Sequence, residues 1–213
     1  MKLVVDDDES CFNSSAAGDV AGGDAGGERW RLDGVTRSLE ETWRLASRVA
    51  EVLRRGDLVL LTGELGAGKT AFAQGVARAL RVEEAVTSPT FTLVHEYNCS
   101  FQEIDTLLHA DLYRLETPGE VEELGLAEML DYGAVGLVEW GERGVPVLGE
   151  SYLEVHMEAL DPGSVDAGDV GEYQEVRLVT CVGVGRSWAR RGDALRHSIE
   201  EYLLDRDVEG GVL

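Results

Sequence analysis

A glycine-rich segment in the first half of the chain has the residue types and the spacing of a phosphate-binding loop. It fits the pattern GxxxxGK[ST] and reads Gly63-Glu64-Leu65-Gly66-Ala67-Gly68-Lys69-Thr70. Glycines allow successive backbone N–H groups to point inward as an anion nest, and a following helix adds its positive N-terminal end. We predict nucleotide contacts along residues 64–70, with Lys69 on the β- and γ-phosphates and the Thr70 hydroxyl on magnesium.

Two acids stand where a magnesium ion would find a further protein ligand. Glu139 ends the apolar run 135–138, and Asp111 ends the run 107–110. Because parallel strands present ligands at their carboxyl ends, either carboxylate can reach the ion or one of its waters. We predict Glu139 in the magnesium shell and Asp111 on the metal or on the attacking water, and the residues alone leave these two roles of Asp111 open. A solvated acid at a strand end is the alternative for each.

Three further features have both a functional and a structural interpretation. The segment 87–92 would approach the γ-phosphate as a switch-like loop, and it is equally compatible with a plain Ser/Thr turn. Its candidate hydroxyls are those of Thr87, Ser88 and Thr90. His109 lies in an apolar run, which favours a core histidine over a base. Trp140 follows Glu139 and is either a core residue or an anchor for a partner.

The elements around the loop have the order that the motif requires. An unbroken apolar run, 57–62, predicts a strand buried on both faces and leads directly into the loop. Residues 70–80 predict a helix after it, so the order is strand, loop, helix. An earlier helix begins at Ser38, a candidate N-cap with Glu41 three residues later, and ends near Gly56.

The rest of the pattern predicts an α/β fold: a P-loop NTPase-like three-layer sandwich with a mostly parallel central sheet and antiparallel edge strands. Helices are expected at 118–130 and 187–204, and 161–171 as a loop between two edge strands. The further strands are expected at 92–97, 107–111, 134–139, 152–157 and 175–180.

Composition indicates one domain in a reducing compartment. We expect a disordered acidic and glycine-rich tail at 1–30, a single P-loop ATPase domain at 31–205 with a flexible loop at 163–172, and a tail at 206–213. The formal charge of -22 argues against a general grip on nucleic acid. The three cysteines are widely spaced, and neither a signal peptide nor a membrane span is evident, so we expect a cytoplasmic protein.

Four segments together, rather than the loop alone, resemble the TsaE (YjeE) family, the ATPases of bacterial tRNA threonylcarbamoyladenosine synthesis. The order and spacing of these segments match from about residue 38 to residue 158. They are the loop 63–70, Thr87-Ser88-Pro89-Thr90-Phe91-Thr92-Leu93-Val94 with Tyr97, His109-Ala110-Asp111-Leu112-Tyr113-Arg114-Leu115, and Val138-Glu139-Trp140. One departure is Gly141, which stands where the family commonly has proline.

The resemblance implies ATP and Mg²⁺ as cofactors and weak hydrolysis by the chain alone. It implies that Glu139 is the Walker B-type acid, that Asp111 is a second acid at the metal, and that Trp140 lies near the nucleotide or a partner. It places Thr87, Ser88 and Thr90 in the switch-like loop. It also implies docking onto TsaB and TsaD, which would hold the tRNA, with ATP hydrolysis resetting the complex between turnovers.

Two alternatives share the same phosphate chemistry. A small-molecule or nucleoside kinase would use 111–114 as part of an acceptor site, although no arginine-rich lid is evident. A GTP-dependent switch would need a guanine-reading segment, and no NKxD-like sequence is present.

Overall fold

The computed structural model describes residues 29–160 and 176–209, with side chains up to Glu200. The described strands form one seven-stranded sheet in the order β1-β7-β6-β2-β5-β4-β3. The strands are β1 (Arg29–Thr36), β2 (Leu58–Thr62), β3 (Val94–Phe101), β4 (Ile104–Asp111), β5 (Val135–Glu139), β6 (Tyr152–Leu160) and β7 (Val176–Val184). The four central strands β6, β2, β5 and β4 are parallel, whereas β1 and β7 on one side and β3 on the other pair antiparallel.

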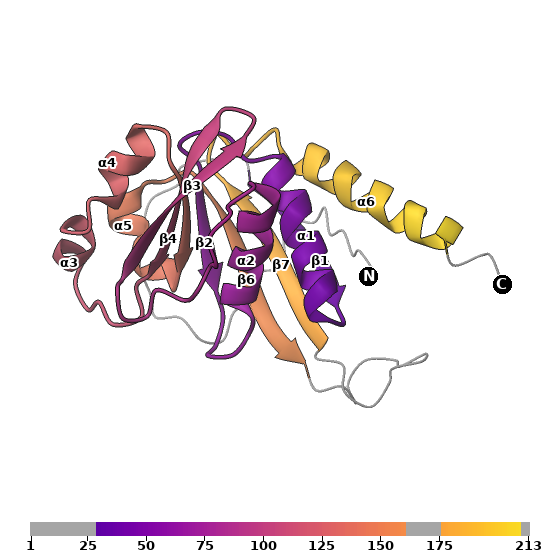
Figure 1. Ribbon diagram of the computed structural model, residues 1–213, viewed down its shortest axis with the longest axis horizontal. Coiled ribbons are helices and arrows are strands. Elements are labelled where there is room, and N and C mark those ends of the chain that lie inside the picture. The colour runs from indigo at the N-terminus through magenta and orange to yellow at the C-terminus, as the bar shows by residue number, and fades with distance from the viewer. Residues whose placement is uncertain (1–28, 161–175, 210–213) are drawn as a thin grey trace.

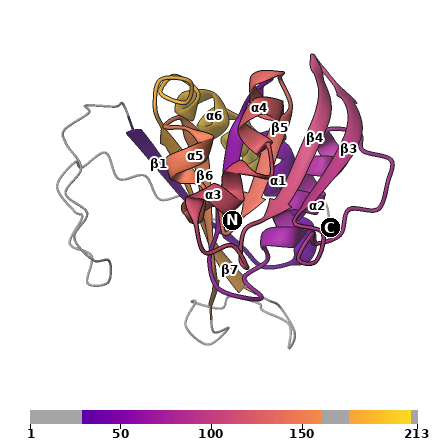
Figure 2. The ribbon, with the colours of Figure 1, turned by 90° about the vertical axis from the view of Figure 1, so that its left-hand side faces the viewer.

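Helices cover both faces of this sheet (Figure 1). They are α1 (Leu39–Glu51), α2 (Lys69–Ala79), α3 (Pro118–Glu122), α4 (Leu126–Asp131), α5 (Val145–Leu148) and α6 (Gly192–Glu209), with a 3-10 turn η1 at Gly141–Arg143. One buried cluster lies under α1, α2 and α6, and a second lies under α3, α4 and α5. The view turned by 90° shows the same division into layers (Figure 2). The predicted three-layer α/β fold with a parallel centre and antiparallel edges is confirmed.

The strand and helix that flank the loop are held by burial. All five residues of β2 are buried, because this strand lies at the centre of the parallel sheet. Helix α2 packs closely on α1 at Gly75, where an added Cβ would lie 2.7 Å from the Cβ of Ala46. The Ser38 hydroxyl accepts a hydrogen bond from the Glu41 N–H at 3.1 Å, so the predicted N-cap of α1 is confirmed.

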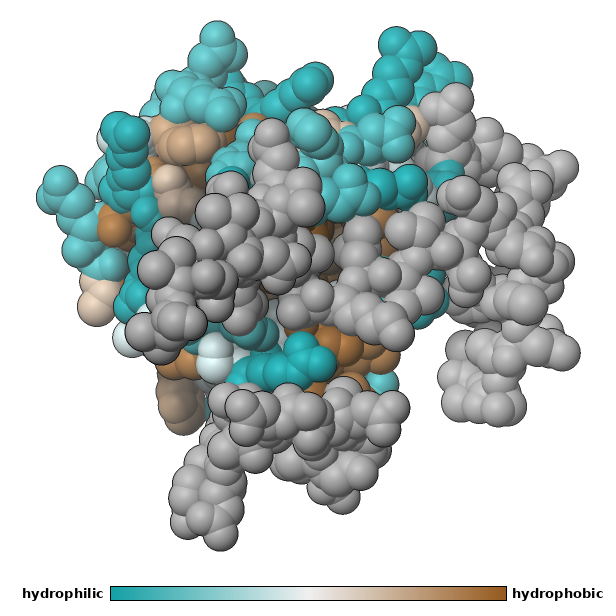
Figure 3. All heavy atoms as spheres, turned by 90° about the vertical axis from the view of Figure 1, so that its right-hand side faces the viewer, coloured by the Kyte–Doolittle hydropathy of each residue, from teal (hydrophilic) through white to brown (hydrophobic). Residues whose placement is uncertain are grey.

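Helix α6 is tied to the start of the central strand. Arg191, just before the helix, forms a bidentate ion pair with buried Asp57, and its Nη2 lies 2.8 Å from Asp57 Oδ1. Trp188 is fully buried beside this pair, and its carbonyl accepts a hydrogen bond from Trp30 Nε1 at 2.6 Å. On the side of the molecule where α6 lies, hydrophilic residues predominate on the described surface (Figure 3), in keeping with the formal charge of -22.

Several element boundaries differ from the sequence-based expectation. The helix expected at 118–130 is two short helices, because Gly125 has a φ of 67° and interrupts the hydrogen-bond ladder. Strand β1 was not predicted. Because it pairs with β7, the outer strand on this side of the sheet is β1 and not β7. The last helix begins at Gly192, and the predicted tail 206–213 starts inside it.

Other predictions fall outside the described part of the chain. The loop at 163–172 lies there entirely, and so does the tail at 1–30 except for Arg29 and Trp30, which belong to β1. Within the described residues, no helix is long and apolar enough to cross a bilayer.

Candidate functional site

The glycine-rich loop connects β2 to α2 at the carboxyl end of the parallel strands. Gly63, Gly66 and Gly68 have positive φ angles of 124°, 83° and 109°, a conformation that favours glycine. A Cβ at Gly63 would collide with the backbone carbonyl of Met157. Among the described residues, the backbone N–H groups of Gly66, Gly68 and Lys69 have no hydrogen-bond acceptor. Such a set of unpaired amides at a helix N-terminus fits a phosphate group.

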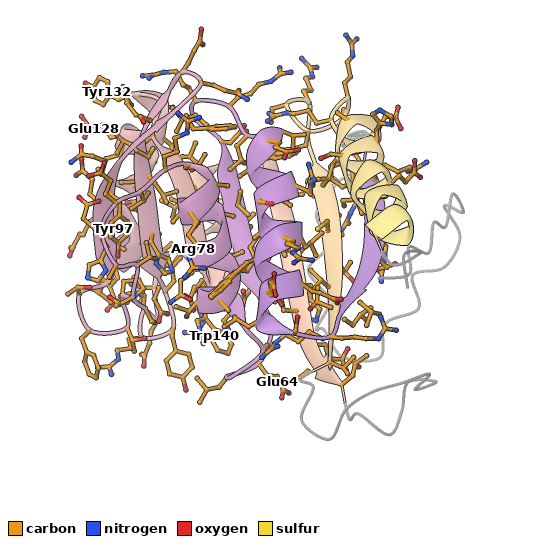
Figure 4. The ribbon with its side chains drawn as sticks, turned by 45° about the vertical axis from the view of Figure 1, so that its right-hand side comes forward. Glu64, Arg78, Tyr97, Glu128, Tyr132 and Trp140 are labelled. Atoms are coloured by element: carbon orange, nitrogen blue, oxygen red, sulfur yellow. The ribbon has the colours of Figure 1, made fainter. Side chains whose placement is uncertain are left out.

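Lys69 lies across the mouth of this loop. Its side chain is 5 % exposed, and its Nζ donates to the carbonyls of Gly63 at 2.6 Å and Glu64 at 2.8 Å. The ammonium also lies 4.1 Å from the centre of the Trp140 ring. Burial lowers the pKa of Lys69, and nearby acids, Glu139 first among them, oppose that shift. Trp140 and Glu64 lie at one end of the sheet, and Tyr132 lies at the other (Figure 4).

The two predicted acids lie side by side next to the loop. Asp111 and Glu139 are direct neighbours on the parallel strands β4 and β5, and both are about 95 % buried. The Thr70 hydroxyl donates to Glu139 Oε1 at 2.7 Å. The alternative of solvated acids at strand ends is therefore wrong for this pair.

His109 contacts the Glu139 carboxylate from within the core. It is fully buried on β4, and its Nε2 lies 2.9 Å from Glu139 Oε1. Its Nδ1 has no partner among the described residues. The prediction of a core histidine is confirmed, with the addition that this histidine holds the carboxylate that also contacts Thr70.

The segment 87–92 contributes one hydroxyl, that of Thr90, to the second acid. The Thr90 hydroxyl donates to Asp111 Oδ2 at 2.9 Å, and the hydroxyls of Ser88 and Thr90 lie 2.7 Å apart. Thr87 is exposed and takes no part in these bonds. The other oxygen of Asp111 accepts the backbone N–H of Tyr113 at 2.9 Å. A switch-like role of this segment stays a prediction.

Trp140 forms a wall of the site. Its backbone has a positive φ of 57°, and its N–H donates to the carbonyl of Leu61 at 2.9 Å. Its ring contacts Tyr113, with 5.0 Å between ring centres. Around the site three apolar side chains are exposed: Leu65 at 90 %, Phe91 at 85 % and Tyr113 at 51 %. These three form what we call the apolar rim.

Magnesium fits the oxygen groups that meet here. Within the described residues, no group of three or more His, Cys, Asp or Glu side chains could hold a metal ion. Mg²⁺ is usually bound through one or two carboxylates together with phosphates and waters, so it does not need such a cluster. Thr70, Glu139 and Asp111 supply one hydroxyl and two carboxylates at the edge of the loop.

Two residues at the back of the loop escaped the sequence analysis. Arg177 on β7 donates from Nε to the carbonyl of Ala67 at 3.0 Å, and Met157 on β6 packs against Gly63 and Gly68. An arginine in a strand about a hundred residues away in sequence gives no local signal of such a contact. Only the pairing of β6 with β7 brings it there.

Buried β2, the glycine loop with its lysine and threonine, and α2 define the chain as an α/β protein of the P-loop class. A comparison with family models then identifies the family. The model described as "Threonylcarbamoyl adenosine biosynthesis protein TsaE" matches residues 36–164, and the chain belongs to this family. The resemblance drawn from the four segments is thereby confirmed.

Individual proteins agree with this assignment. The chain is similar to the tRNA threonylcarbamoyladenosine biosynthesis protein TsaE of Streptomyces coelicolor, with 41 % identity over 146 residues that cover 68 % of this chain and 92 % of that protein. The protein of the same name from Mycobacterium tuberculosis is 39 % identical, over 57 % of this chain and 76 % of its own. The crystal structure of YdiB from Bacillus subtilis matches with a TM-score of 0.62 and 30 % identity, over 79 % of this chain and 96 % of that one.

Proposed function

We propose that this protein binds ATP with Mg²⁺ and hydrolyses it as the ATPase component of the machinery that makes N6-threonylcarbamoyladenosine in tRNA. The observation that carries the proposal is the 2.7 Å hydrogen bond between Thr70 and Glu139. It brings the loop hydroxyl and a buried strand-end acid to one point, as a shared magnesium ion requires. Membership of the TsaE family supports the pathway.

Each group of the site has a task in this proposal. The unpaired loop amides bind the phosphates, and Lys69 exchanges the carbonyls of Gly63 and Glu64 for phosphate oxygens. Bound ATP and Mg²⁺ supply the reacting phosphoryl group and the charge that neutralises it. Glu139 and Thr70 hold the metal, whereas Asp111 holds either the metal or the attacking water.

The proposed partners are TsaB and TsaD in the cytoplasm, and the tRNA is bound through them. The apolar rim supports a protein contact at the nucleotide site, because exposed aromatic and apolar side chains are typical of interfaces. The formal charge of -22 supports leaving the tRNA to the partners, since binding of nucleic acid relies on clustered Lys and Arg.

Calorimetry with ATP and Mg²⁺ tests the binding step. We expect the wild type to bind, and Lys69→Met to weaken ATP about 100-fold, because a buried ammonium near phosphates contributes a few kcal/mol. Arg186→Met is a matched control: it removes the same charge from an exposed residue beyond the end of β7, opposite the loop. No ATP binding by the wild type, or equal affinities of wild type and Lys69→Met, would refute the nucleotide site.

A second experiment tests the pathway. The tagged protein is recovered from extract of its own cells with and without ATP, and we expect TsaB and TsaD in the eluate. Depletion of the protein should lower the content of N6-threonylcarbamoyladenosine in total tRNA, measured by mass spectrometry of nucleosides. Unchanged modification after depletion, with the γ-phosphate found on a small acceptor, would point to a kinase instead.

A further inference from the structure

Arg177 reaches the phosphate-binding loop from a part of the chain that the family model does not match. That model ends at residue 164, and Arg177 is the second residue of β7. Its register partners are Ala159 on β6 and Thr36 on β1. The residue is 8 % exposed, and its Nε donates to the carbonyl of Ala67 at 3.0 Å in a buried setting.

The arginine lies directly behind the loop backbone. A Cβ built on Gly68 would stand 2.8 Å from Arg177 Nε and 3.1 Å from its Cδ, and 3.2 Å from Met157 Cε. No side chain fits between them. Ala67 itself is 2 % exposed, so water does not offer its carbonyl a replacement partner.

The orientation of one peptide unit follows from this bond. In a trans peptide the C=O of one residue and the N–H of the next point in opposite directions, and no cis peptide bond occurs among the described residues. With the Ala67 carbonyl turned toward Arg177, the Gly68 N–H faces the other way. That N–H has no acceptor among the described residues, as expected of a group that donates a hydrogen bond to a bound phosphate.

The Ala67–Gly68 peptide needs this hydrogen bond because glycines flank Ala67. Gly66 and Gly68 have φ angles of 83° and 109°, and glycine changes between backbone regions at little cost. A flip of the Ala67–Gly68 peptide would turn a carbonyl oxygen, instead of an N–H, toward the phosphates. One buried, charge-assisted hydrogen bond is enough to shift such an equilibrium by an order of magnitude.

We propose that Arg177 is a positioning residue of the nucleotide site, which fixes the Ala67–Gly68 peptide so that the Gly68 N–H points at the bound phosphate. The inference rests on the proposed function, since it assumes that the loop binds ATP. It extends the site beyond the family-matched region to β7.

Two variants separate the hydrogen bond from the charge. Gln carries its amide nitrogen on Cδ, where Arg carries Nε, so Arg177→Gln keeps a donor at that place and loses the charge. Arg177→Met has a similar shape but no donor. We expect ATP–Mg²⁺ affinity, measured by calorimetry, to fall about tenfold in Arg177→Met and to stay within about threefold of wild type in Arg177→Gln. Thermal unfolding without nucleotide should shift similarly in both, because both lose the charge.

The outcomes distinguish this inference from the proposed function. If the wild type binds ATP and both variants bind equally well, or are weakened equally, the positioning role fails while the nucleotide site stands. If the wild type does not bind ATP, the proposed function fails, and the inference fails with it. Should Arg177→Met not fold, Arg177→Leu, which also lacks a donor, takes its place: an affinity about tenfold below that of Arg177→Gln supports the positioning role, and equal affinities of the two variants overturn it.

Discussion

Replacing Glu139 by Gln tests the proposed division of labour between the loop and the strand-end acid. The variant keeps the shape of the side chain. Its amide oxygen can still accept the hydrogen bond that the Thr70 hydroxyl donates to Glu139 Oε1 at 2.7 Å in the wild type. It removes one negative charge from a site that is 4 % exposed. An ion held by Thr70 would lie within roughly 4 Å of this carboxylate, where a unit charge pair contributes about 4 kcal/mol at an effective dielectric constant of about 20.

Phosphates and water screen part of that energy, so we expect Glu139→Gln to lose about 100-fold in turnover, or about 2.7 kcal/mol. ATP affinity should change by less than about tenfold, because the loop amides and Lys69 remain. Turnover is measured by phosphate release with TsaB and TsaD present, and affinity by calorimetry. The control is Glu154→Gln, a partly buried acid on β6 that contacts Thr62 at 3.2 Å instead of Thr70.

Undiminished phosphate release by Glu139→Gln would refute the assignment and move the metal to Asp111. A loss of ATP affinity as large as the loss of turnover would also contradict it, because the acid would then act on binding in general. The same measurements on Asp111→Asn would show whether the second acid shares the metal.

Two further predictions concern stability. Gly75→Ala should lower the free energy of unfolding by about 1–2 kcal/mol, because overpacking against α1 outweighs a helix-propensity gain of about 1 kcal/mol. The control is Gly119→Ala, where an added Cβ meets nothing within 4 Å. Equal thermal unfolding midpoints of Gly75→Ala and Gly119→Ala would contradict the close packing of α2 on α1. Burial raises the pKa of Cys181 from 9.0 to about 12, so the unfolded thiol ionises first as pH rises and the protein loses stability above about pH 9. Between about pH 8 and about pH 10 this loss of stability is about 1.4 kcal/mol. Denaturant titrations should show that Cys181→Ala lacks this loss. An identical pH dependence of both proteins would show that the thiol is not buried as a neutral group.

The central part of the fold could be predicted because its signals are local. The apolar run at β2, the glycine loop and the amphipathic α2 follow one another without a break, so the chain order itself gives their spatial order. The pairing of Asp111 with Glu139 could be predicted because both end apolar runs, and parallel strands align such ends.

The outer strands could not be predicted in the same way. In β1 only Leu32, Gly34 and Thr36 are buried, and its polar residues, such as Arg31 and Asp33, resemble those of a loop. An edge strand with charged side chains is stabilised by its neighbour rather than by its own pattern. The break at Gly125 was missed because the apolar spacing on both sides of it still fits one helix.

The chemical groups of the phosphate-binding loop are therefore specified by its local sequence, whereas the residues that pack behind its backbone are distant in sequence. Its lysine, threonine and glycines all lie within residues 63–70, and the motif supplies the groups that can face a phosphate. Its main chain, however, rests on Met157 and Arg177 from β6 and β7. Because glycines that allow the nest also allow other conformations, the local motif cannot select the binding-competent backbone by itself. The antiparallel pairing of β6 and β7 supplies that selection, which is why affinity for ATP should depend on a strand that carries none of the residues of the motif.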